Sequence, residues 1–106
     1  MEDRRFPRID IDEPVGIHAG DYYKVEKGRQ FSEGGMLFES DRDFTEGQLV
    51  VMTFQLSDTV LIRLEGTIAY TVKPVPGKRL IGVRFTGAEN DHVKVLVEYF
   101  KKRGTC

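Results

Sequence analysis

Polar and apolar residues alternate along most of the chain, a pattern typical of strands that bury one face. The clearest alternation covers residues 48–56, and the longest covers residues 60–72. In these two segments the residues expected to face inward are Val50, Met52, Phe54, Leu56, Ile62, Leu64, Ile68, Tyr70 and Val72. Both segments are therefore predicted to be strands of a sheet with one face against a core.

Shorter strands are expected on either side of this pair. Residues 15–25 are predicted to form one strand, with Gly16 and Gly20 as sites of bulges. Residues 36–38 and 79–85 complete the set. Turns are expected at 27–29, where a glycine lies between two basic residues, and at 74–77, where two prolines stiffen the chain.

Near the end of the chain the spacing of the apolar residues changes from the alternation of a strand to the spacing of a helix. Asn90 is a suitable N-cap for a helix over 90–103, and Gly104 is a suitable stop. One apolar stripe follows at helical spacing, made by Val93, Leu96, Val97 and Phe100. Short antiparallel strands closed by one helix favour a small, mainly β barrel. We expect a single domain over 1–106, with an arm at 1–9, a barrel at 14–86 and the helix at 90–103.

Composition narrows the class of partner and compartment. The chain of 106 residues has a formal net charge of -1, so a nucleic-acid polymer is not an expected partner and any anion site must be local. The single cysteine, Cys106, allows no intrachain disulfide, which favours a reducing compartment. No apolar segment is long enough to span a bilayer, and no secretory leader is evident. A soluble cytoplasmic protein without membrane association is expected.

Enzymatic chemistry has little support. His18 and His92 are far apart and have no cysteine nearby, so no metal cluster is expected. Ser32 lies in a glycine-flanked turn, but no histidine is evidently placed to activate it. We expect no catalytic residue, no metal and no cofactor, and therefore no enzyme.

A basic arm opens the chain. Arg4, Arg5 and Arg8 crowd into a segment that Pro7 keeps from being helical. A guanidinium group can grip phosphate with two hydrogen bonds, bridge the O6 and N7 atoms of guanine, or stack on a base. Taken alone, such an arm would by default be interpreted as a solvated, disordered basic tail.

The second candidate segment is the turn over residues 30–36, with the sequence Gln-Phe-Ser-Glu-Gly-Gly-Met. It combines an amide, a hydroxyl and two glycines between two expected strands. Gly34 and Gly35 allow positive φ, and they also allow the backbone to come close to something flat. We expect this turn and the arm to form one site.

Together the two segments resemble the signature of the PilZ domain family. Arg4 and Arg8 match its paired Arg-x-x-x-Arg, and Ser32 and Gly35 match its Asp/Asn-x-Ser-x-x-Gly motif. The sequence Gly-Val-Arg-Phe at 82–85 resembles the strand that ends the family's barrel. The resemblance covers essentially the whole chain. It departs at Gln30, where the family has Asp or Asn.

The resemblance implies a six-stranded antiparallel split barrel with a C-terminal helix that binds the bacterial second messenger cyclic di-GMP. By this resemblance, Arg4, Arg8, Ser32 and Gly35 would form the ligand site, and Arg5 and Gln30 would add contacts. The protein would be a stand-alone receptor that changes conformation on binding and passes the signal to a downstream bacterial effector protein. The alternative is a degenerate module that binds a protein partner without nucleotide.

Overall fold

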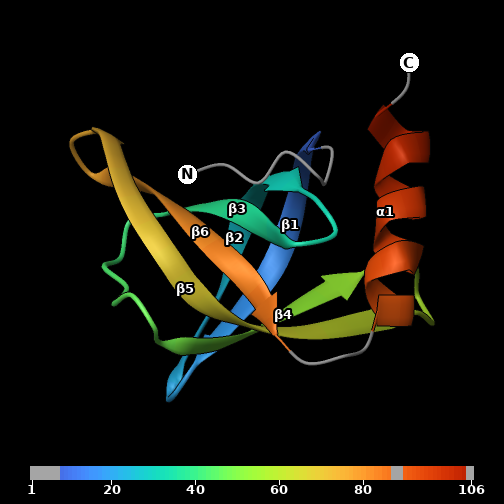
Figure 1. Cartoon of the computed structure of the whole chain (residues 1–106), viewed down its shortest axis with the longest axis horizontal. Coiled ribbons are helices and arrows are strands. Elements are labelled where there is room, and N and C mark those ends of the chain that lie inside the picture. Colours follow the sequence, from blue (N-terminus) through green and yellow to red (C-terminus); the bar gives the residue numbers. More distant parts are fainter. Residues whose placement is uncertain (1–7, 87–89, 105–106) are drawn as a thin grey trace.

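The computed structural model describes residues 8–86 and 90–104, which form six antiparallel strands and one helix. The elements in chain order are β1 (Ile9–Ala19), β2 (Tyr22–Phe31), β3 (Gly35–Ser40), β4 (Leu49–Gln55), β5 (Leu61–Val75), β6 (Lys78–Thr86) and α1 (Asn90–Gly104). The strands close into a barrel in the order β1-β2-β3-β6-β5-β4, with α1 beside it (Figure 1). The predicted fold class, a small six-stranded antiparallel barrel with a C-terminal helix, is confirmed.

The barrel closes where β1 pairs with β4, which is the shortest of its strand pairings. Only Gly16, Ile17 and His18 of β1 pair with β4. Helix α1 packs against β1 and β5, and its predicted apolar stripe is buried: Val93, Leu96, Val97 and Phe100. The inward residues predicted for β4 before its end, Val50, Met52 and Phe54, are buried as well. The buried face of the helix therefore joins the core of the barrel.

The prediction of one strand over 15–25 was wrong. The chain reverses at Gly20, where φ is 62°, and β1 and β2 pair as a hairpin in which Ala19 faces Tyr22. A left-handed conformation of this kind is costly for residues with a side chain, and glycine adopts it readily. The sequence-based interpretation treated Gly20 as a bulge and so merged two strands into one.

The turn predicted at 27–29 was also wrong. Gly28 lies within β2, where it is buried and pairs with Glu13 on one side and Phe38 on the other. Register shifts accompany both pairings, so the glycine marks irregular strand pairing and not the end of a strand. Strand β1 also begins earlier than expected, at Ile9.

A bulge in β5 overturns part of the predicted alternation. Ile68 pairs with Val83, but Tyr70 pairs with Gly82, so β5 holds one extra residue between the two pairs. The inward face therefore ends at Ile68. Tyr70 and Val72, which were expected inside, are 42% and 48% exposed.

Candidate functional site

A cavity of about 530 Å³ lies on the outside of the barrel, beside β3, β6 and the turn that joins β2 to β3. Four of the residues predicted for the ligand site line it: Arg8, Gln30, Ser32 and Gly35. Strand pairing explains why they meet, because β2 lies between β1 and β3 in the barrel. The other two predicted residues, Arg4 and Arg5, lie outside the described part of the chain.

Ser32 organises the turn in which it lies. Its hydroxyl accepts a hydrogen bond from the amide of Gly34 at 3.2 Å and donates one to the carbonyl of Gly35 at 3.3 Å. Its own amide also donates to the Gly35 carbonyl, at 2.9 Å. Since a hydroxyl has one proton and two lone pairs, one lone pair of Ser32 is left to accept a hydrogen bond from a ligand.

Gly35 is needed for close packing between strands. A Cβ atom at this position would overlap the carbonyl oxygen of Val83 in β6. Positive φ is confined, among the described residues, to Gly20, Gly47 and Gly77, so Gly34 and Gly35 do not use the conformational freedom that glycine allows. The role of Gly35 in this fold is to let β3 approach β6.

Two further lining residues, Tyr70 and Arg84, were not singled out from the sequence. The β5 bulge turns Tyr70 outward, and its ring lies so close over Gly82 that a Cβ there would overlap it. Arg84 is exposed and pairs with Gly35. The Gly-Val-Arg-Phe segment and the aromatic residue in a long strand were signals that could have pointed to them.

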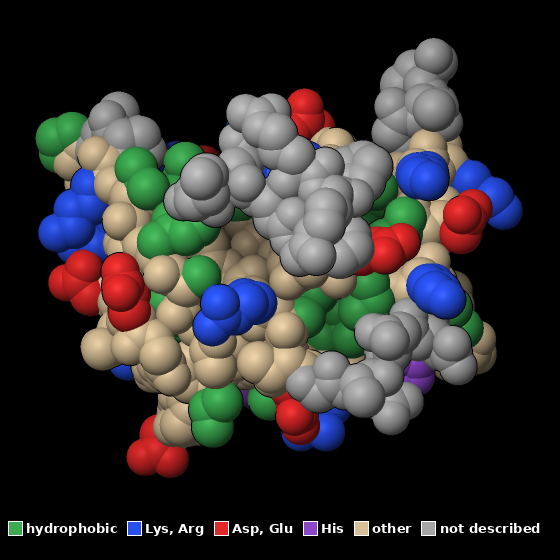
Figure 2. Space-filling view, in the orientation of Figure 1, with side chains coloured by type: hydrophobic (Ala, Val, Ile, Leu, Met, Phe, Trp, Pro, Cys, Tyr) green, Lys and Arg blue, Asp and Glu red, His purple; other side chains and the backbone are tan. Residues whose placement is uncertain are grey.

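The charge of the cavity lining is all positive. Among its described lining residues, the charged side chains are those of Arg8 and Arg84. Elsewhere, basic and acidic side chains are interspersed over the face seen in Figure 2. The cavity is therefore a local cationic site on a chain whose net charge is -1, and it is suited to an anion with flat, polar groups.

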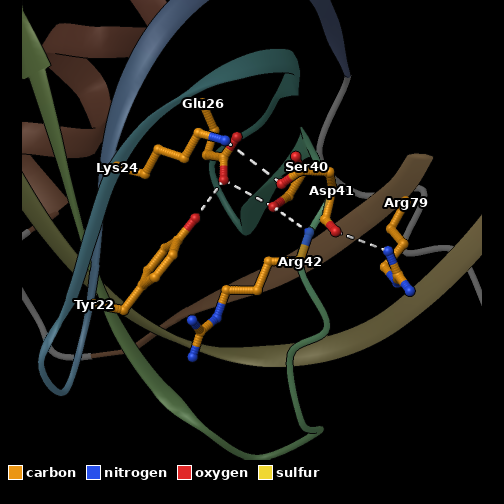
Figure 3. Close-up of polar contacts among 7 residues, drawn as sticks. All are labelled: Tyr22, Lys24, Glu26, Ser40, Asp41, Arg42 and Arg79. Atoms are coloured by element: carbon orange, nitrogen blue, oxygen red, sulfur yellow. Dashed lines mark hydrogen bonds and ion pairs between the residues drawn. The ribbon is translucent and has the colours of Figure 1, made fainter. Parts of the chain in front are cut away.

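A separate polar cluster lies at the opposite end of the β2–β3 pair (Figure 3). Glu26 is buried and accepts hydrogen bonds from the hydroxyl of Tyr22 at 2.8 Å and from Ser40 at 2.7 Å. The guanidinium carbon of Arg42 lies 4.0 Å from the centroid of the Tyr22 ring. Ser40 also accepts a hydrogen bond from the Arg42 amide. The cluster fixes the start of the loop after β3.

Burial raises the pKa of Tyr22 to about 12, and the hydrogen bond to Glu26 adds to the effect. Both causes disfavour tyrosinate, since its charge would be poorly solvated and would face a carboxylate. Tyr22 is therefore a neutral donor that helps satisfy a buried acceptor. This cluster has a structural explanation and none of its members lines the cavity.

Among the described residues, no group of three or more His, Cys, Asp or Glu side chains comes close enough together to hold a metal ion. None of the helical segments described is long and apolar enough to cross a membrane.

Comparison with known proteins identifies the family. The PilZ domain profile matches residues 2–102, nearly the full length, so the chain belongs to the PilZ domain family. No curated protein shows significant sequence similarity to the chain.

Solved structures share the fold at low sequence identity. The motility inhibitor MotI/DgrA of Bacillus subtilis has a TM-score of 0.78 and 18% identity, with 97% of this chain and 51% of that protein aligned. The MrkH–c-di-GMP complex of K. pneumonia has a TM-score of 0.74 and 12% identity, with 97% of this chain and 55% of that protein aligned. The PilZ domain of Escherichia coli YcgR with c-di-GMP has a TM-score of 0.74 and 11% identity, with 96% of this chain and 94% of that chain aligned. The chain thus spans about half the length of the first two proteins.

Proposed function

We propose that this domain binds cyclic di-GMP in the cavity lined by Arg8, Gln30, Ser32 and Gly35. The observation that supports the proposal is that Arg8, from the first half of the family signature, lines the same cavity as Ser32 and Gly35 from the second half. YcgR and MrkH, which share the fold, are described as complexes with this dinucleotide. Arg4 and Arg5, by the same resemblance, would join from the preceding arm.

The chemistry of the lining suits such a ligand. Cyclic di-GMP is a dianion with two guanine bases, and Arg8 and Arg84 can pair with phosphate or with the O6 and N7 atoms of guanine. The exposed ring of Tyr70 offers a surface on which a base can stack. The remaining lone pair of Ser32 can accept a hydrogen bond from a guanine N–H group.

Binding is tested by calorimetric titration of the chain with cyclic di-GMP. We expect saturable binding, and Arg8→Ala should weaken it by roughly 1–3 kcal/mol, the scale of a bidentate arginine–guanine contact. Arg63→Ala is the matched control, because Arg63 is exposed on β5 and does not line the cavity. No binding by the unaltered chain would leave the degenerate, protein-binding module as the better hypothesis.

The output of the receptor is proposed to be a change in the arm. A charged segment containing proline gains order when its arginines grip a dianion, at an entropic cost. Amide exchange over 1–8 should then slow with ligand while β4 stays unchanged. We expect the altered surface to engage a downstream bacterial effector in the cytoplasm. Equal exchange of the arm with and without ligand would exclude this mechanism.

A further inference from the structure

The departure of Gln30 from the family motif is accompanied by a contact with β1. Asp10 is the register partner of Gln30, and its Oδ1 atom lies 3.1 Å from Nε2 of the glutamine. A carboxylate can only accept hydrogen bonds, so the NH₂ end of the amide must face Asp10. The carbonyl oxygen of Gln30 is then directed away from Asp10 and is available to another donor.

The position of the pair puts the Gln30 side chain at the candidate site. Gln30 lines the main cavity together with Arg8 and Ser32. It also lines a neighbouring cavity of about 500 Å³, to which Asp10 contributes. Gln30 is half-buried and lines both cavities, whereas Asp10 is exposed and lines only the second. Gln30 therefore lies where the two cavities adjoin, and the orientation of its amide affects whether the main cavity meets a donor or an acceptor.

We infer that Asp10 is a positioning residue that orients the Gln30 amide and so makes the site selective for guanine. The inference rests on the proposed function. The Watson–Crick edge of guanine carries N1–H and an amino group, both donors, which a fixed carbonyl oxygen can accept. Adenine has an unprotonated N1 at the corresponding place, and its lone pair would face the same oxygen. A hydrogen-bond acceptor held in place therefore favours guanine and disfavours adenine.

The contact also changes what a substitution at Gln30 should do. Gln30→Asp would restore the family's residue, but it would set a second carboxylate opposite Asp10. The two like charges would repel each other across the strand pair. We therefore expect Gln30→Asp to improve the site only when Asp10 is neutral.

A simpler explanation is that the hydrogen bond merely joins β1 to β2. Such cross-strand pairs have small effects on stability. In that case loss of the Asp10 carboxylate would change the binding of guanine and adenine dinucleotides by the same factor. The two explanations differ in the ratio of affinities, which a purely structural role does not alter.

The test measures the affinities of the full chain for cyclic di-GMP and cyclic di-AMP by calorimetry. Asp10→Asn gives Gln30 a partner that both donates and accepts, so the amide is free to turn. We expect the guanine-to-adenine affinity ratio to fall about tenfold, the effect of one misplaced hydrogen bond. Asp12→Asn is the control, since Asp12 is a nearby exposed carboxylate on β1 paired with Lys27 at 3.5 Å.

The double variant Asp10→Asn/Gln30→Asp should restore the ratio, because it again presents an acceptor at position 30. An unchanged ratio in Asp10→Asn, whether or not both affinities fall, would overturn the inference while leaving the proposed function intact. Failure of the unaltered chain to bind cyclic di-GMP would overturn both.

Discussion

Phe31 lies between Gln30 and Ser32 in the chain, and its ring centroid is 5.1 Å from that of Phe100 in α1. Both rings are buried, and both also contact Phe54. The residue that precedes the turn of the candidate site therefore packs directly against the C-terminal helix. Packing in the helix and order in the turn should be linked.

The first prediction follows from this contact. Phe100→Ala should lower the free energy of unfolding by about 3–5 kcal/mol, as is typical for loss of a buried phenylalanine. With the milder Phe100→Leu, the Ser32 amide should lose hydrogen-exchange protection more than that of Met52. The control is Val95→Ala, on an exposed face of α1. Uniform loss of protection in Phe100→Leu would show that the helix supports the barrel without favouring the turn.

A second prediction concerns Gly35. Gly35→Ala should push β3 from β6 because the new methyl group overlaps the Val83 carbonyl, at a cost of about 1–3 kcal/mol. Gly20→Asn should cost less, since the space there is open and asparagine is among the residues that best tolerate the strain of positive φ. Chemical denaturation of both variants measures the difference. If Gly35→Ala kept full stability and lost only ligand affinity, room for a purine would be the better explanation of this glycine.

The third prediction is a pH dependence set by Tyr22. Its pKa in the folded protein is about 12, above the ordinary value of 10, so the stability gained from the neutral hydroxyl is fully present below pH 10. That stability should be lost as the pH rises from 10 to about 12. Tyr22→Phe should be less stable near neutral pH by about 1–3 kcal/mol, because Glu26 loses a donor, and should not show this alkaline loss.

Denaturant unfolding at several alkaline pH values measures this effect. Tyr23→Phe serves as the control, because Tyr23 is the exposed neighbour in the chain. A parallel alkaline decline in the unaltered chain and Tyr22→Phe would assign the decline to other groups.

Local patterns predicted the regular parts of this fold. The buried face of β4 follows from its alternating pattern, and Val50, Met52 and Phe54 are buried as expected. The buried face of α1 follows from its apolar stripe in the same way, and that stripe, which ends at Phe100, is buried too. The boundary at Gly20 was missed because a glycine in an alternating segment is equally compatible with a bulge and a two-residue turn.

The site was only partly predictable for a related reason. Arg8, Gln30, Ser32 and Gly35 belong to short motifs that can be read without knowing the fold. The contact between Asp10 and Gln30 depends on strand register, which a local pattern does not specify. Tyr70 was assigned to the core because strict alternation from Ile68 places it there, and the bulge reverses that assignment.

The last prediction tests this outward position of Tyr70. The ring rests on Gly82, which holds it in place, and it lines the cavity. Stacking of a base on an aromatic ring contributes about 1–3 kcal/mol, so Tyr70→Ala should weaken cyclic di-GMP binding by that amount. Tyr70→Phe keeps the ring and should keep most of the affinity.

Val72→Ala is the matched control, because Val72 is also an exposed residue of β5 but does not line the cavity. Titration calorimetry and thermal unfolding should be run on all three variants. Tyr70→Ala also uncovers Gly82, so some loss of stability is expected in addition to the loss of affinity. If Tyr70→Ala lowered the melting temperature and left affinity unchanged, the ring would serve only to cover β6. Loss of affinity in Tyr70→Phe as well would assign the contact to the hydroxyl group and exclude stacking as its main source.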